Sequence, residues 1–201
     1  MASSTEICNL ALSHLGIAKP IANLSTEQSQ EASACRVFYE ITRDTVMKDY
    51  PWPFCTKIAA MALVEEDPNV EWQYSYRYPS DCLAVRKILS GVRNETSSER
   101  IPYKISSDSQ GLLIFSDLEE AEMEYTVKVT DANLYSTDFI LAFSFRLASY
   151  LAPRLTAGDP FKLADRMLQM YRLEMSKATA NAFNEEQRDP TPDPELIQER
   201  N

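Results

Sequence analysis

The chain has 201 residues, of which 44% are hydrophobic and 25% are charged, and its net charge is −10 at pH 7. This length allows one sizeable core, and no apolar run reaches the roughly 20 residues of a membrane-spanning helix. The acidic balance argues against tight binding to duplex nucleic acid, because contacts to phosphates need clustered Lys and Arg.

Residues 1–6 lack the basic and apolar stretches of a signal peptide, so we expect a cytoplasmic protein unless it leaves the cell in a particle. His14 is the only histidine, and the cysteines form no Cys-x2-4-Cys pair. We therefore predict no metal site and no cofactor, with free buried thiols in a reducing compartment. The four cysteines are Cys8, Cys35, Cys55 and Cys82.

The first helix is predicted to begin at residue 4. Ser3 and Glu6 have the spacing of a capping box, in which the side chain of each residue accepts a hydrogen bond from the backbone N–H of the other. Apolar residues then recur at helical spacing as far as Leu15. Gly16 follows at the position where a left-handed residue commonly ends a helix.

A second helix is predicted over about residues 26–49. Ser25 and Gln28 repeat the capping spacing at its start, and Pro51 cannot continue it. The side that we expect to face the core carries Ala34, Val37, Phe38 and Ile41.

Residues 54–130 have the pattern of an antiparallel β region. Residues 71–78 alternate aromatic and polar side chains, the period of a half-buried strand. Residues 107–111 predict a hairpin turn, and the connections are too short for helical crossovers between parallel strands. The other strand candidates are residues 83–89, 101–105, 112–115 and 123–129.

A second pair of helices is predicted over residues 137–183. The first begins at Thr137 or Asp138, and Pro153 is expected to kink or end it. Asp159 as N-cap and Pro160 at the first helical position start the second. The apolar stripe of this last helix is Ala164, Met167, Leu168, Tyr171, Met175, Ala178 and Ala182.

These elements predict a mostly α fold in one domain over residues 1–186. Helices within 4–50 and 137–183 form a bundle, and the β region of residues 54–130 is inserted between them. Residues 187–201 are acidic and Pro-rich, so we expect an extended tail.

The order of these motifs resembles the head-to-tail adaptor family of tailed phages, which includes tail tubular protein A of short-tailed phages. In the first half the resemblance is carried by Ile7-Cys8-Asn9-Leu10-Ala11-Leu12 with Leu15-Gly16, by Cys35, Tyr39 and Arg43-Asp44, and by Pro51-Trp52-Pro53-Phe54. In the second half it is carried by Arg146-Leu147-Ala148, Leu151-Ala152, Leu155-Thr156-Ala157-Gly158-Asp159, Leu168, Tyr171 and Ala178.

The resemblance implies a structural protein of the virion that is assembled in the host cytoplasm. Such adaptors form a ring, commonly of twelve copies, between the portal protein and a tail nozzle protein similar to tail tubular protein B. DNA passes through the ring without specific binding, and no membrane is involved. The C-terminal tail rises into the portal, which implies a portal-binding set of Pro190, Pro192, Asp193, Pro194, Leu196 and Ile197.

Other functions stay open at this stage. A connector of a long-tailed phage, used in head completion, has a similar helical body. A glycan-degrading tail hydrolase needs two carboxylates at a fixed separation, although the chain has no G-x-S-x-G elbow or Gly-rich phosphate loop. We therefore predict that the protein is not an enzyme. The carboxylate candidates are Glu65, Glu66, Asp67, Glu119 and Glu120.

Two further patterns have both a structural and a functional interpretation. Tyr74, Tyr76 and Tyr78 suit base stacking in a single-strand binder, but their spacing is equally that of packed residues on one strand face, which we favour. The acidic tail is either a portal-binding segment or only a solubilising extension.

Overall fold

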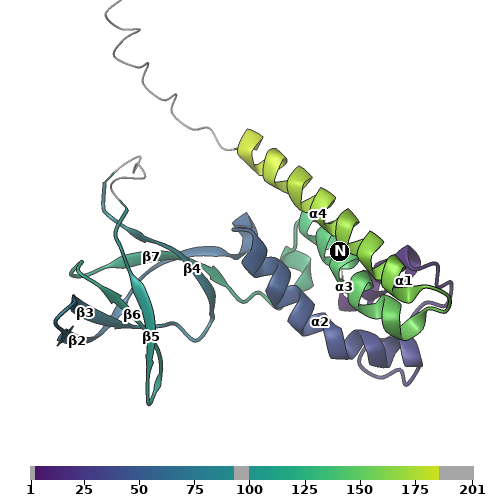
Figure 1. The fold of residues 1–201 in the computed structure, drawn as a ribbon, viewed down its shortest axis with the longest axis horizontal. Coiled ribbons are helices and arrows are strands. Elements are labelled where there is room, and N and C mark those ends of the chain that lie inside the picture. Colours follow the sequence, from purple (N-terminus) through teal and green to yellow (C-terminus); the bar gives the residue numbers. More distant parts are fainter. Residues whose placement is uncertain (1–2, 93–99, 186–201) are drawn as a thin grey trace, which may run out of the picture.

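The computed structural model describes residues 3–92 and 100–185 (Figure 1). Helix accounts for 46% of the structure and strand for 25%, with four α-helices and two antiparallel sheets in the described part of the chain. The predicted mostly α bundle is therefore wrong, because the β region is a substantial body with its own core. The fold is α+β, with helices and sheets segregated along the long axis.

The helical body is built from four helices that come from both ends of the chain. They are α1 (Ser4–His14), α2 (Gln30–Asp49), α3 (Thr137–Leu155) and α4 (Pro160–Glu185). The central helix is α3, which packs against each of the other three. Of the apolar face that the sequence predicts for it, Phe139, Phe143, Leu147 and Leu151 have no exposed surface, whereas Ile140 is half-buried. Ala142 and Ala148, which we expected to permit close approach, are fully buried as well.

The ends of α1 follow the sequence signals. The Ser3 N–H donates to the Glu6 carboxylate at 2.7 Å, and the Glu6 N–H donates to Ser3 Oγ at 3.2 Å, which confirms the capping box. Gly16 has a positive φ of 75°, and its N–H and that of Ile17 donate to carbonyls of the last turn. These two bonds satisfy carbonyl groups that the helix end would otherwise leave unpaired.

The start and the buried face of α2 differ from the prediction. Ser29, not Ser25, caps the helix by accepting from the Ala32 N–H. Val37 and Ile41 are 57% and 65% exposed. The side that faces α3 instead carries a mixed set of residues, several of them polar: Ala32, Ala34, Cys35, Tyr39, Thr42, Arg43, Val46 and Met47. The prediction is therefore confirmed for Ala34, which is fully buried, and for Phe38, whose ring stacks on that of Tyr150 at 5.7 Å, and it is wrong for Val37 and Ile41.

The β body contains two antiparallel sheets. The three-stranded sheet has the order β1 (Thr56–Ala60), β7 (Glu122–Val127), β4 (Cys82–Leu89). The four-stranded sheet has the order β2 (Ala62–Asn69), β3 (Trp72–Arg77), β6 (Gly111–Ser116), β5 (Lys104–Asp108). Asp108 pairs with Gly111, which confirms the predicted hairpin turn. Strands β1 and β2 were not predicted. In β2, three consecutive acidic residues and Pro68 hide the strand pattern.

Each of the two bodies has its own core of buried residues. The larger lies among the four helices and includes Trp52 and Tyr135 from the connecting segments. The smaller lies between the two sheets and consists of Met61, Tyr76, Ile88, Ile114, Ala121, Met123 and Tyr125. No helix among the described residues is long and apolar enough to cross a membrane.

Arg86 on β4 joins the two bodies. Its Nε donates to Thr126 Oγ1 at 2.7 Å, and its Nη2 donates to the carbonyls of Met47 and Lys48 at 3.1 and 3.0 Å. These carbonyls belong to the last turn of α2, whose partial negative charge favours a cation. The sheet therefore caps the helix across the junction.

Candidate functional site

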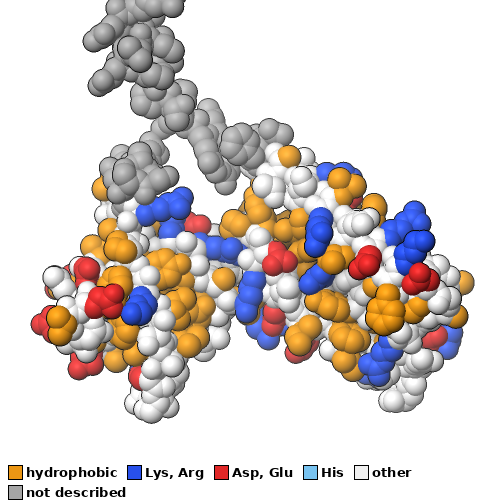
Figure 2. Space-filling model, in the orientation of Figure 1, with side chains coloured by type: hydrophobic (Ala, Val, Ile, Leu, Met, Phe, Trp, Pro, Cys, Tyr) orange, Lys and Arg blue, Asp and Glu red, His pale blue; other side chains and the backbone are white. Residues whose placement is uncertain are grey.

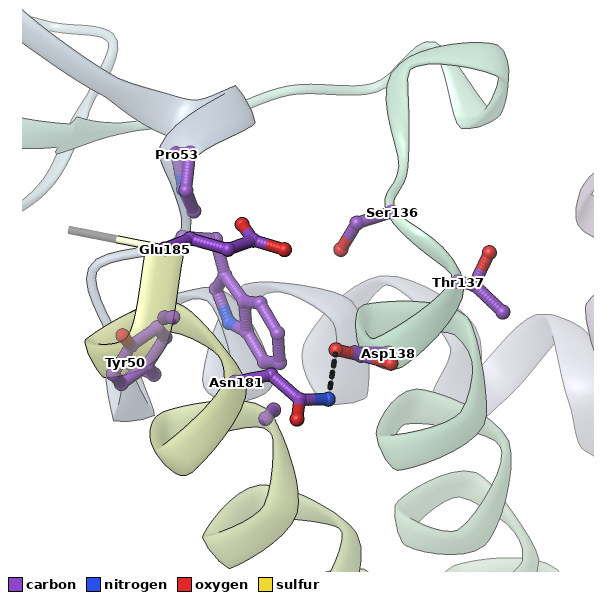
Figure 3. Close-up of a pocket in the computed structure, with 10 residues that line it drawn as sticks. Tyr50, Pro53, Ser136, Thr137, Asp138, Asn181 and Glu185 are labelled. Carbon is purple, nitrogen blue, oxygen red and sulfur yellow. Dashed lines mark hydrogen bonds between the residues drawn. The ribbon is translucent and has the colours of Figure 1, made fainter.

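A pocket of about 180 Å³ lies at the end of the helical body, where α3 begins and α4 ends (Figure 3). Glu185, the last described residue, is part of its wall, so the pocket adjoins the point where the predicted tail starts. The lining residues are Tyr50, Trp52, Pro53, Ser136, Thr137, Asp138, Ala178, Asn181, Ala182 and Glu185.

The floor of this pocket is rigid because Trp52 is fixed from three directions. The indole N–H donates to the Val46 carbonyl at 2.9 Å, and only 2% of the residue is exposed. Its ring meets those of Tyr50 and Phe139 edge to face at 5.2 and 5.3 Å. Trp52 therefore anchors the turn after α2.

The rim of the pocket is polar and acidic. Asn181 Nδ2 donates to Asp138 Oδ2 at 3.3 Å, which links α4 to the first turn of α3 (Figure 3). Ser136 caps α3 by accepting from the Phe139 N–H. Figure 3 shows the Glu185 carboxylate pointing toward Ser136. With two carboxylates beside apolar ring surface, the pocket suits a neutral or basic segment with proline or apolar side chains, and it disfavours anions.

The predicted portal-binding residues Pro190, Pro192, Asp193, Pro194, Leu196 and Ile197 lie outside the described residues. The last residue that the structure describes is Glu185, at the C-terminal end of α4. That helix begins as predicted, since the Lys162 N–H donates to the Asp159 carboxylate at 3.1 Å. Its apolar stripe packs into the helical core through Met167, Tyr171 and Ala178.

The carboxylates considered for hydrolysis are all exposed. Glu65 and Glu66 pair with Ser75 and Tyr74 respectively, so the two neighbouring side chains point to opposite faces of the sheet. Burial raises the pKa of Tyr74, and the negative charges of Glu119, Glu66 and Asp67 raise it further. Thus part of the acidic set gathers around one tyrosine at the outer end of the four-stranded sheet.

The tyrosine ladder is a packing feature. Tyr76 is 1% exposed, and its hydroxyl donates to the Leu118 carbonyl at 2.5 Å. Its ring lies 6.4 Å from that of Tyr74. A buried ring cannot stack on a base, so the structural interpretation of this ladder is confirmed for Tyr76.

The thiols and the histidine are structural in this fold. All four cysteines are free, and Cys8, Cys35 and Cys55 are buried. A hydrogen bond with Cys35, together with burial, raises the pKa of the Cys8 thiol. His14 stacks on Phe145 at 3.9 Å, and burial lowers its pKa. Within residues 3–92 and 100–185, no group of three His, Cys, Asp or Glu is placed to hold a metal ion.

One surface was missed because only the apolar positions of α4 were considered. Lys162, Arg166, Leu173 and Lys177 are exposed and follow one another at intervals of four, seven and four residues. Such intervals place them on one side of a helix, opposite the buried stripe. The helical spacing of the basic residues along α4 is the pattern that would have predicted this face.

Comparison with models of known protein families gave no match, and comparison with curated proteins gave none either.

Proposed function

We propose that this protein is a structural adaptor in the head-to-tail connector of a tailed phage. In this role several copies form a ring, twelve in the expected case, between the portal protein and the tail nozzle. The observation that carries the proposal is the joining of two helix pairs, far apart in sequence, into one body. That body begins and ends in the motifs that resemble the adaptor family, and α4 leads directly into the tail.

The tail is proposed as the portal-binding element. Its prolines limit the entropy that is lost when it becomes ordered, and Leu196 and Ile197 are its apolar anchors. Burial of two such side chains is worth roughly 3–6 kcal/mol before the cost of ordering. The pocket beside Asp138 and Glu185 is acidic, and this charge disfavours binding of the tail's own carboxylates there.

The proposed role toward DNA is passive. A net charge of −10 keeps the channel wall from holding the phosphate backbone. We expect duplex binding no tighter than the non-specific level, on the order of 10⁻⁴ M at physiological salt.

The test is native mass spectrometry of the full chain, alone and mixed with the portal protein encoded in the same genome. We expect mostly monomer alone, because the net charge of −10 on each copy keeps any contact between free copies weak, and a defined ring of copies on the portal. Deletion of residues 188–201 should weaken docking without lowering the melting temperature, since the described helical core is complete without them.

A second variant, with Leu196→Asp and Ile197→Asp, isolates the two anchors from tail length. Its matched control is Val37→Asp with Ile41→Asp, which adds the same charge to exposed positions on α2. Absence of any portal complex for the intact chain would disprove the adaptor function. Unchanged docking of both tail variants would instead confine the tail to a solubilising role.

A further inference from the structure

The outer end of the β body carries a local excess of acidic side chains. Figure 2 shows acidic side chains gathered at the end that carries β2 and β3, and basic side chains interspersed with acidic ones over the helical body. On α4 the exposed charged residues are Lys162, Asp165, Arg166, Arg172, Lys177 and Glu185, so basic ones predominate. An overall acidic chain thus presents a local basic face.

The acidic end is also an open edge of a sheet. Strand β2 lies at the edge of its four-stranded sheet, and its Leu63 and Val64 are 50% and 44% exposed. The exposed carboxylates of Glu65, Glu66 and Asp67 follow directly and join no ion pair among the described residues. We call residues 63–67 the acidic edge. Strand β2 has acidic residues and Pro68, which protect an edge from non-specific pairing, but its exposed Leu63 and Val64 leave apolar surface that a partner can cover.

The basic face consists of Lys162, Arg166, Leu173 and Lys177 on the outer side of α4, and we call it the basic stripe. An open groove of about 610 Å³ runs beside its first turns. Charge in this groove is mixed, because it is lined by Asp159, Lys162, Leu163, Asp165, Arg166 and Gln169. Lys177 already contacts Glu174 of its own helix at 2.7 Å, whereas Lys162 and Arg166 join no ion pair in the described structure.

We propose that the acidic edge of one copy docks on the basic stripe of the next copy. The two surfaces match in charge, and each has apolar side chains, Leu63 and Val64 on the edge and Leu173 on the stripe. The acidic edge is the shorter surface, about 13 Å over its five residues, so it fits within the stripe, which extends over about 22 Å.

Because the two surfaces are different parts of the molecule, the contact is head-to-tail and continues from copy to copy. Such a contact gives a ring when the rotation closes. Only the closure into a ring rests on the proposed adaptor function. The pairing of the two surfaces is a property of the chain itself, and it can be tested without a portal.

The experiment traps the contact by disulfide formation in the full-length chain. A Cys82→Ser background removes the half-buried thiol, and Val64→Cys with Leu173→Cys places one thiol on each surface. Under mild oxidation we expect a ladder of linked multimers on a non-reducing gel. The matched control combines Val64→Cys with Val37→Cys, an equally exposed apolar residue on α2, and should stay largely monomeric.

Mixing the two single-cysteine chains should give dimers of one chain of each kind and nothing larger, because each chain then offers only one reactive surface. Glu65→Lys with Glu66→Lys in the double-cysteine chain should lower the yield of multimers about tenfold. Adding Arg166→Glu and Lys177→Glu should restore it. A control with Glu31→Lys and Glu40→Lys makes the same charge change on α2, away from the acidic edge, and should leave the ladder intact.

No ladder, an equal ladder in the Val37→Cys control, or no rescue by the charge exchange would overturn the inference. The result is independent of portal docking, which is measured separately. Loss of the ladder with intact docking would therefore refute the contact and leave the adaptor function standing. A ladder without portal docking would support the contact and disprove the adaptor function.

Discussion

The helical body of this protein is more completely buried than its β body. In the helical body α3 is surrounded by three other helices, and its Phe139 contacts the rings of Trp52, Phe54, Tyr135 and Phe143 at 4.8–5.7 Å. In the β body two small sheets cover each other on one side, and β2 is exposed along nearly its whole length. The helices therefore provide the stable frame, and the sheets provide exposed surface for contacts.

This difference has a simple physical origin. A helix can be enclosed on all sides while its backbone hydrogen bonds stay within itself. A sheet of three or four strands always leaves two edges whose backbone groups need water or a partner. A chain that combines enclosed helices with open sheets therefore has both a stable scaffold and exposed surfaces that can bind a partner.

The largest effect is expected from Phe139→Ala. It removes the central ring of the aromatic group and should destabilise the helical body by about 3–5 kcal/mol, measured by urea unfolding. Phe161→Ala makes the same chemical change at a residue that is 72% exposed, and it should alter the free energy of unfolding very little. Equal effects of the two variants would contradict the central position of α3.

A smaller effect is expected in the β body from Ile114→Ala, about 2–4 kcal/mol, since this residue is fully buried between the sheets. Its control is Ile105→Ala, the register partner on β5, which is 46% exposed. Far-UV circular dichroism, which is dominated by the helices, would follow the helical body, and hydrogen exchange of the amides of β3, β6 and β7 would follow the β body. A shift of the whole transition, with both probes coinciding, would show that the bodies unfold as one unit.

The smallest effect is expected at the junction. Arg86→Met leaves the last carbonyls of α2 without their cationic donor and should cost about 1–3 kcal/mol. Lys87→Met removes a neighbouring surface ion pair with Glu124 at 3.7 Å and should cost less than about 1 kcal/mol. Hydrogen exchange at the end of α2 is the measurement, and faster exchange in the Arg86 variant alone is the expected result.

Much of the local structure was predictable from short-range chemistry. The capping box of Ser3 and Glu6, the left-handed Gly16 and the Asp159–Pro160 helix start each depend on neighbours within a few residues. The face of α3 was predictable because its apolar residues are uniform and strong. The face of α2 was not, because Arg43 is buried through its 2.8 Å contact with Asp44 while Ile41 is left exposed.

The candidate surfaces were predictable only in part. The tail was recognised by composition, and its residues lie beyond those that the structure describes. The acidic residues 65–67 were noticed as possible catalytic groups, whereas the structure places them on an exposed edge strand. Nothing in their local sequence distinguishes a loop from an edge, since both are exposed and polar.

The sequence by itself determined the starts of α1, α3 and α4 and the ends of α1 and α2, because caps, prolines and glycines act on adjacent backbone groups. It also determined that two helix pairs are separated by a β region. Only the tertiary structure decided that this region has a core of its own, which side of α2 is buried, and which strand lies at an edge. These outcomes depend on contacts between residues far apart in the chain, and local periodicity does not encode such contacts.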